Sequence, residues 1–179
     1  LIVLQGSRHS AKSEYNYRSI SATNGDELFR MKVERTRSNS RDVDGSALTV
    51  GDTAYIGLEN GIFKVFNPDD DYATVRGKFY EPEIYNGVNL FNKNDIARIG
   101  GNIITESSPA LLYGKIYITA GSGYVYGYNI KSGEIDWEYF IGADLNGSPV
   151  ITDDKCILVS VEKQNIAGNG GILKLDPKK

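Results

Sequence analysis

An internal repeat constrains the fold of this chain more than any other feature of its sequence. Three segments begin with small residues and pass through the same order of strands and turns, namely 45–70 (GSALTV onward), 107–133 (SSPALL onward) and 147–179 (GSPVIT onward). In each segment a short apolar strand, a polar turn, a stronger apolar strand, a second turn and a third strand follow one another. Side chains within the strands alternate with a period of two, as at Tyr124 and Tyr126. We therefore expect an antiparallel meander in each segment.

Glycines mark the hairpins of these meanders. The tripeptides ENG at 59–61 and GSG at 121–123 place glycine between two apolar runs. Tight hairpins need positive φ angles, which glycine adopts at little cost. No stretch of the chain shows a long apolar stripe with a helical period. The pattern predicts hairpin turns at 60–61 and 121–123 and almost no helix.

A fourth strand follows the third in two places. TNGDELFRMKV (23–33) and KSGEIDWEYF (131–140) share a polar turn with glycine, an acidic residue and an alternating apolar strand. The complete unit is a four-stranded meander of about 40 residues. Such a sheet has two apolar faces and can bury them only by stacking against neighbouring sheets. Radial stacking of four-stranded meanders is a β-propeller.

The best-defined repeat, 107–140, resembles one blade of the pyrroloquinoline quinone (PQQ) type, or quinoprotein-like, β-propeller family. The matching pieces are Ser108-Pro109-Ala110 at the start of the inner strand, Gly121 to Gly123 at the hairpin, and Ser132-Gly133 followed by Trp137 four residues on. The resemblance implies that Trp137 docks against the neighbouring blade and that Gly133 and Pro109 are structural. Phe29 takes the place of the tryptophan in the first repeat.

The predicted fold class is all-β, with about four blades of four-stranded antiparallel meanders. Because closed rings in the family that the chain resembles have seven or eight blades, we expect a segment of such a ring; a small four-bladed ring is the alternative. The approximate blades are 1–33, 45–80, 107–141 and 147–179, separated by long loops at 34–44 and 81–106. An integrin-type repeat is a second possibility, suggested only by DVDGS at 42–46.

Composition offers little for catalysis or metal binding. The formal charge of −3 gives no electrostatic reason to expect nucleic acid as a partner, and no apolar run is long enough to span a membrane. His9 is the only histidine and Cys156 the only cysteine, so an internal disulfide and a thiolate metal cluster are excluded. The acidic run PDDD (68–71) is interpreted as a solvated hairpin turn, and RDVDG (41–45) is a weak match to a calcium loop. We expect no catalytic residue, no metal and no cofactor.

Long connections suggest where a partner binds. The connections 7–14, 162–170, 34–44 and 81–106 would emerge on one face of a propeller, and the opposite turns would have about two to four residues. Arginine with aromatics is typical of protein or sugar recognition. The candidate binding residues are Arg35, Arg37, Arg41, Phe79, Tyr80, Tyr85 and Phe91.

The predicted function is a non-enzymatic scaffold that binds a protein partner or an extended ligand through this face. The resemblance suggests the propeller lipoprotein of the outer-membrane β-barrel assembly machinery as a functional analogue, which implies a periplasmic, cell-surface or extracellular location. Two alternatives stay open. One is part of a PQQ- and calcium-dependent dehydrogenase, for which the resemblance implies calcium ligands and a disulfide of adjacent cysteines. The other is a ligand-sensing propeller domain of a signalling protein.

Overall fold

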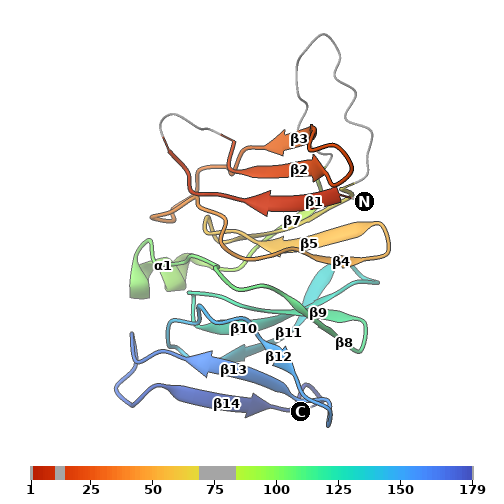
Figure 1. Cartoon of the computed structure of the whole chain (residues 1–179). Helices are drawn as coiled ribbons and strands as arrows, with labels where there is room; N and C mark the ends of the chain where they lie inside the picture. The colour runs from red at the N-terminus through yellow and green to blue at the C-terminus, as the bar shows by residue number, and fades with distance from the viewer. Residues whose placement is uncertain (1, 11–14, 69–83, 179) are drawn as a thin grey trace.

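The computed structural model describes residues 2–10, 15–68 and 84–178, although the side chains of 84–86 are not described. Four antiparallel sheets, called blades 1 to 4 here, are stacked in chain order (Figure 1). Within each blade every strand pairs with the next along the chain. The strands are β1 (Ile2–Gly6), β2 (Tyr17–Ser21) and β3 (Glu27–Met31) in blade 1; β4 (Leu48–Val50), β5 (Thr53–Gly57), β6 (Ile62–Phe66) and β7 (Ile84–Asn89) in blade 2; β8 (Ala110–Leu112), β9 (Lys115–Thr119), β10 (Tyr124–Asn129) and β11 (Glu134–Phe140) in blade 3; and β12 (Val150–Ile151), β13 (Ile157–Val161) and β14 (Gly171–Leu175) in blade 4.

The period-two alternation of the strands divides their side chains between two interfaces. In β5, Ala54 and Ile56 face blade 1, whereas Tyr55 packs on the other side against residues of blade 3. In β9, Ile116 faces blade 2 and Tyr117 faces blade 4. Each interface between consecutive blades thus has its own apolar cluster, and inner blades are covered on both faces. This explains why the middle strands of blades 2 and 3, namely β5, β6, β9 and β10, are almost entirely buried.

The predicted hairpin turns are confirmed. Gly61 has a φ of 79° and Gly123 a φ of 87°, the region that favours glycine. The turns are closed by equivalent hydrogen bonds, from the Gly61 N–H to the Leu58 carbonyl at 2.9 Å and from the Gly123 N–H to the Ala120 carbonyl at 2.9 Å. The GSG and ENG tripeptides therefore form equivalent hairpin turns.

Hydrogen bonds also join one blade to the next at the start of each inner strand. The Ser46 N–H donates to the Ser108 Oγ at 2.9 Å, and the Ser108 N–H donates to the Ser148 Oγ at 2.8 Å. These serines hold the same place in the repeats GSA, SSP and GSP. The serines of blades 3 and 4 are therefore acceptors for the preceding blade.

The loop predicted at 81–106 is wrong in part, because it contains both β7 and the helix α1 (Lys93–Ile99). Strand β7 pairs with β6 as the outer strand of blade 2, which places that strand beyond residue 80. Its sequence IYNGVN has too few apolar residues to signal a strand, and pairing with β6 decides its conformation. Strand β6 ends at Phe66 and β7 begins at Ile84, so most of the residues between them, and most of PDDD (68–71), lie outside the described residues.

Helix α1 is short and is held by its ends. The Asn92 side chain accepts hydrogen bonds from the N–H groups of Asn94 and Asp95, and the Asp95 carboxylate accepts from the Asn92 N–H, forming a capping box. Arg98 pairs with Asp95 at 3.0 Å and donates to the Ser122 carbonyl, which ties the helix to the β9–β10 hairpin. The expectation of almost no helix holds, since α1 with seven residues is the only helix in the described part of the chain. It is far too short to cross a membrane.

Candidate functional site

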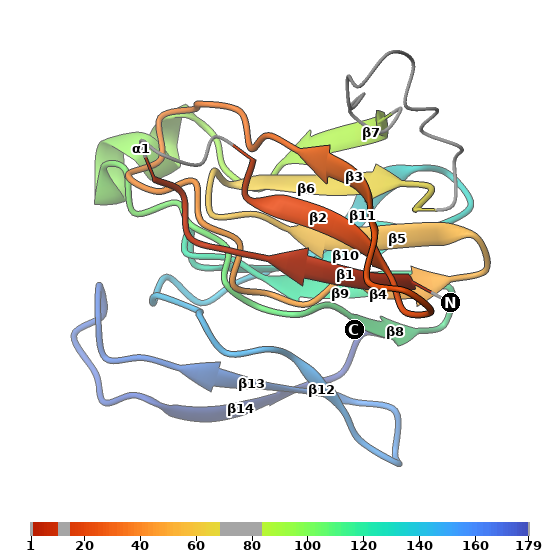
Figure 2. The ribbon, with the colours of Figure 1, turned by 45° about the horizontal axis from the view of Figure 1, so that its top comes forward.

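The connections between blades gather at one end of the strands. The segments 32–47, 90–109 and 141–149 join consecutive blades, and together with α1 and the hairpins at 58–61 and 120–123 they form what we call the loop face. This face lies on the left of Figure 1, and Figure 2 shows the helix and the same connections on one side of the stack. Because all of these segments are tied to blade cores, the loop face is a fixed surface on a rigid scaffold.

Alternating hydroxyl side chains order the first of these connections. The Thr36 Oγ1 accepts from the Ser38 N–H, the Ser38 Oγ from the Ser40 N–H, and the Ser40 Oγ from the Asp42 N–H, at 3.1 to 3.3 Å. Thr36 and Ser38 also donate to the carbonyls of Asn60 and Glu59 in the hairpin of blade 2. The even-numbered side chains are therefore turned towards the protein, whereas Arg35, Arg37 and Asn39 are exposed.

The arginines border a polar pocket of about 330 Å³. It is lined by Arg8, His9, Arg35, Ser38, Asn39, Ser40, Arg41 and Asp42. Asp42 organises one wall, because its carboxylate accepts from the His9 N–H at 2.7 Å and pairs with Arg8 at 3.5 Å. The Arg41 Nη2 lies 3.5 Å from the His9 Nδ1. The pocket combines cationic side chains with hydroxyl groups, which suits an anionic or strongly polar group of a partner.

A backbone hydrogen bond links 34–44 and 81–106, two of the four connections that were predicted to emerge on the binding face. The Asn39 N–H donates to the Gly101 carbonyl at 2.9 Å, which joins the connection before blade 2 to the segment after α1. Arg35 and Arg41 line the polar pocket described above. Arg37 lies between them in sequence and is exposed. Phe91 is half-buried against Gly61 and does not line this pocket.

The structure does not describe the side chains of three predicted aromatic binding residues. Phe79 and Tyr80 lie outside the described residues, and Tyr85 belongs to β7, although its side chain is not described. Gly133 occupies the β10–β11 turn with a φ of 74°, and Pro109 is buried immediately before β8. The roles assigned to these residues stay predictions.

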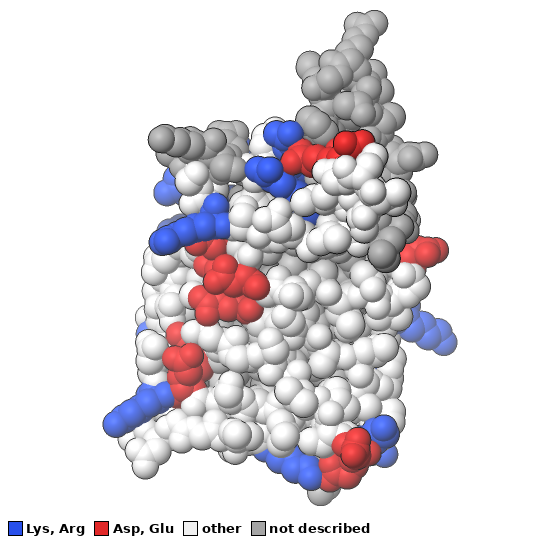
Figure 3. Space-filling model, in the orientation of Figure 1, with Lys and Arg blue, Asp and Glu red and all other residues white. Residues whose placement is uncertain are grey.

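A group of carboxylates on the loop face went unnoticed in the sequence. Asp44, Glu59 and Glu106 each bring a carboxylate oxygen within 4.8 Å of the others. They come from the connection before β4, the β5–β6 hairpin and the connection before β8. Figure 3, drawn in the orientation of Figure 1, shows acidic side chains gathered on the left, where the loop face lies. Oxygen ligands at this spacing can hold a divalent cation or accept from a cationic side chain.

Burial and mutual repulsion shape the electrostatics of this acidic trio. Burial raises the pKa of Glu59 from its ordinary 4.5 to about 7; a hydrogen bond with Ser40 opposes the shift, and the nearby carboxylates add to it. Burial and the charge of Asp44 likewise raise the pKa of Glu106. In the next blade, burial raises the pKa of Asp144, although the Asn102 side chain donates to it at 2.7 Å. Binding of a cationic partner would offset the repulsion between these carboxylates and stabilise their charged forms.

The repeat itself contains the missed signal. The Glu59 N–H donates to the Asp42 carbonyl, the Gly121 N–H to the Ile104 carbonyl, and the Glu162 N–H to the Asp144 carbonyl. This shared contact shows that Glu59 and Glu162 are equivalent, as are Asp42 and Asp144. Aligning the repeats through to these loop positions would have revealed acidic residues recurring at the same two places.

Trp137 lies between blades 3 and 4, half-buried against the apolar cluster of that interface. Its ring meets Tyr117 edge-on at 5.5 Å and stacks on Tyr139 at 6.5 Å. Because a fully buried large aromatic costs about 3–5 kcal/mol when truncated, we expect Trp137→Ala to cost about 2 kcal/mol. Urea unfolding would measure this, with Tyr113→Ala, an exposed aromatic residue that does not stack on Trp137, as the control. A loss below about 0.5 kcal/mol would show that Trp137 adds nothing to the interface.

Comparison with known proteins identifies the fold. No family model matches the sequence, and no curated protein matches it. Among solved structures, the quinohemoprotein alcohol dehydrogenase ADHIIG from Pseudomonas putida HK5 aligns with 95% of the chain at a TM-score of 0.67 and 12% identity, and BamB from Moraxella catarrhalis aligns with 97% at 0.55 and 14%. Sqt1 from Saccharomyces cerevisiae aligns with 97% at a TM-score of 0.62 and 10% identity. The chain spans 27% of ADHIIG, 47% of BamB and 43% of Sqt1.

These alignments confirm the predicted all-β propeller fold and its likeness to PQQ-type quinoproteins. The identities are too low to transfer an activity, because one fold serves unrelated functions.

Proposed function

We propose that the chain is a non-enzymatic propeller scaffold whose loop face binds a protein partner in the cell envelope or outside the cell. The arrangement of opposite charges on one fixed surface carries this proposal. The arginine pocket and the acidic trio lie on the same connections, with Asp42 next to both. A surface with positive and negative groups in fixed positions selects a partner with the complementary pattern. The fold similarity to BamB, a neighbour by structure, supports an envelope location.

Two features favour a macromolecular partner over a small ligand. The pocket opens on an extended face built from three inter-blade connections. A partner can contact the arginines and the carboxylates at the same time only if its own surface is of similar extent. Arg35 lines the pocket and Arg37 is next but one in sequence; both are exposed, and exposed charges steer association more than they add affinity.

The double variant Arg35→Ala/Arg37→Ala tests the proposal. We expect recovery of partners from a cell-envelope extract to fall at least about fivefold at low salt, because rim charges accelerate encounter. The salt dependence of recovery should flatten at the same time. Lys131→Ala/Lys155→Ala is the matched control, since it removes two exposed cations from turns at the opposite end of the strands. Equal recovery of every partner by both variants and the wild type would refute binding by the loop face.

A second candidate, part of a PQQ- and calcium-dependent dehydrogenase, is favoured by the acidic trio alone. The trio fits a calcium ion, which prefers oxygen ligands. The cysteine chemistry does not fit, because Cys156 is the only cysteine and the disulfide of adjacent cysteines implied by the resemblance cannot form. Absorbance of the protein after addition of PQQ and calcium distinguishes the candidates. A saturable quinone spectrum would favour the dehydrogenase, and an unchanged sum of the two spectra would favour the scaffold.

A further inference from the structure

We propose that the arginine pocket of the loop face binds a doubly charged oxyanion of the phosphate type. Of the described residues that line it, three are arginines (Arg8, Arg35 and Arg41) and one is a carboxylate (Asp42), in a chain whose formal charge is −3. The excess of positive charge exceeds what one carboxylate of a ligand supplies, whereas a phosphate monoester carries a charge of about −1.5 to −2 and three strong acceptor oxygens. The inference rests on the proposed function, because it names the chemical group that the loop face recognises.

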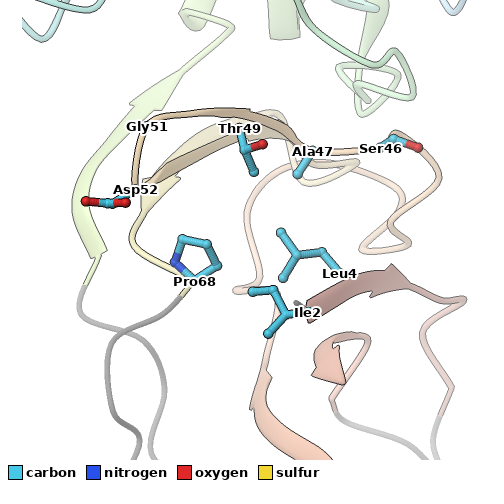
Figure 4. Close-up of a pocket in the computed structure, with 8 residues that line it drawn as sticks. All are labelled: Ile2, Leu4, Ser46, Ala47, Thr49, Gly51, Asp52 and Pro68. Atoms are coloured by element: carbon cyan, nitrogen blue, oxygen red, sulfur yellow. The ribbon is translucent and has the colours of Figure 1, made fainter. Parts of the chain in front are cut away.

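Two other hollows in the described structure lack this positive excess. Figure 4 shows one of about 420 Å³ between β1 and β4, where Asp52 is the one charged residue among those described that line it. Another, of about 400 Å³, is lined chiefly by residues of β11 and β14, and its charged members are Glu138, Lys174 and Asp176. Both of these hollows carry a net negative charge. The accumulation of cations is therefore a particular property of the arginine pocket.

Two of the three guanidinium groups have no carboxylate to balance them. Asp42 is shared between the Arg8 side chain and the His9 N–H. Among the residues that the structure describes, no carboxylate forms an ion pair with Arg35 or Arg41. The Arg41 guanidinium instead lies beside the His9 Nδ1, and because a guanidinium only donates, this nitrogen is the acceptor. Unbalanced arginine side chains suit a planar or tetrahedral oxyanion, which can accept two hydrogen bonds from each.

Hydrogen bonds fix the two walls of the pocket relative to each other. One wall comes from the residues that follow β1 and the other from the connection between blades 1 and 2. The Val43 N–H donates to the Ser7 carbonyl at 3.3 Å, and the buried Asn16 side chain donates to the Arg41 carbonyl. Asn16 in turn accepts from the Val33 N–H at 3.2 Å. The backbone that carries the arginines is thus positioned in advance, so binding has to order only their side chains.

Inorganic sulfate is the first probe, because it stays doubly charged at neutral pH. The full chain is titrated with sodium sulfate at constant ionic strength, with sodium chloride as the balancing salt. We expect saturable amide shifts in residues 8–9 and 35–42, with a dissociation constant of about 1 mM. Arg35→Ala and Arg41→Ala should each weaken binding about tenfold, since each removes charge-assisted hydrogen bonds.

Arg37→Ala is the matched control for these variants. Arg37 is exposed in the same connection but does not line the pocket, so its removal should change the affinity for sulfate by less than about twofold. The unfolding midpoint of each variant checks that folding is preserved, which is expected because none of these side chains belongs to an apolar cluster between blades.

Further probes define the chemistry of the ligand. Inorganic phosphate at pH 8 should match sulfate, and acetate, with a single charge, should bind about tenfold more weakly or less. A short glycine peptide that carries one phosphoserine is compared with its serine counterpart. Binding of the phosphopeptide that is tighter than that of inorganic phosphate identifies a group attached to a partner chain, and weaker binding identifies the free anion; either result supports an oxyanion site.

The outcomes that overturn the inference are an absence of saturable shifts, equal affinity for acetate and sulfate, unchanged affinity in Arg35→Ala and Arg41→Ala, or an equal loss in Arg37→Ala. The proposed function is judged separately by partner recovery. If sulfate does not bind but Arg35→Ala/Arg37→Ala still loses its partners, only this inference fails. If sulfate binds but partner recovery is unchanged in that double variant, the proposed function fails and the oxyanion site stands.

Discussion

Replacing Phe66 with alanine is expected to lower the free energy of unfolding by about 3–5 kcal/mol, the usual range for a fully buried phenylalanine. Phe66 ends β6 and is 0% exposed. Its ring meets Tyr17 edge-on at 5.9 Å and Phe29 edge-on at 6.1 Å, so it joins blade 2 to blade 1. Truncation would leave a cavity between two sheets whose backbone pairing prevents them from closing it. Urea unfolding followed by tyrosine fluorescence and circular dichroism measures the loss.

The matched control for this substitution is Tyr113→Ala. Tyr113 is an aromatic residue that is 51% exposed in the β8–β9 turn, and its removal should change stability by about 0.5 kcal/mol or less. If Phe66→Ala also cost less than about 1 kcal/mol, blade 1 would not be packed on blade 2 as described.

The agreement between sequence and structure follows from the local nature of the repeat. A strand such as KIYIT carries its own period of two, and a hairpin such as GSG carries its own glycine, so both can be recognised within a few residues. The stacking of blades also follows from the sequence, because Tyr55 and Ile56 are both large and apolar on opposite faces of one strand. A strand with two apolar faces requires a neighbour on each side.

What the sequence did not reveal depends on contacts between distant segments. Asp44, Glu59 and Glu106 become neighbours only when blades 2 and 3 stack; the aligned repeats indicate recurring acidic loop positions, but no local pattern shows that these three side chains meet. Strand β7 depends on β6 for its hydrogen bonds, and its sequence alone reads as a loop. Arg35 and Arg37 are a different case, since the alternating hydroxyls of TRSNSR give a local reason for their exposure.

The second large effect expected is that Glu59→Gln stabilises the protein at pH 8 by about 2–3 kcal/mol relative to the wild type. Glu59 is 4% exposed and its pKa rises to about 7 through burial. In the unfolded chain its pKa returns to 4.5, so between pH 4.5 and 7 the folded state binds more protons than the unfolded state. Stability from this group is therefore complete below pH 4.5 and is lost as the pH rises through 7. Glutamine has a neutral side chain of the same shape, so the variant does not lose this stability as the pH rises.

The measurement is urea unfolding of wild type and Glu59→Gln at pH 5 and at pH 8. At pH 5 the wild-type carboxyl is largely protonated in the folded state, so the two proteins should differ by less than about 1 kcal/mol. At pH 8 the full difference should appear, and it should shrink if a divalent cation or a cationic peptide occupies the trio and stabilises the wild-type charge. Glu134→Gln, which removes an exposed carboxylate in β11, is the control and should differ from the wild type by about 0.5 kcal/mol or less. A difference that is equal at both pH values would mean that Glu59 is not buried among repelling carboxylates, and the electrostatic basis of the loop face would fail with it.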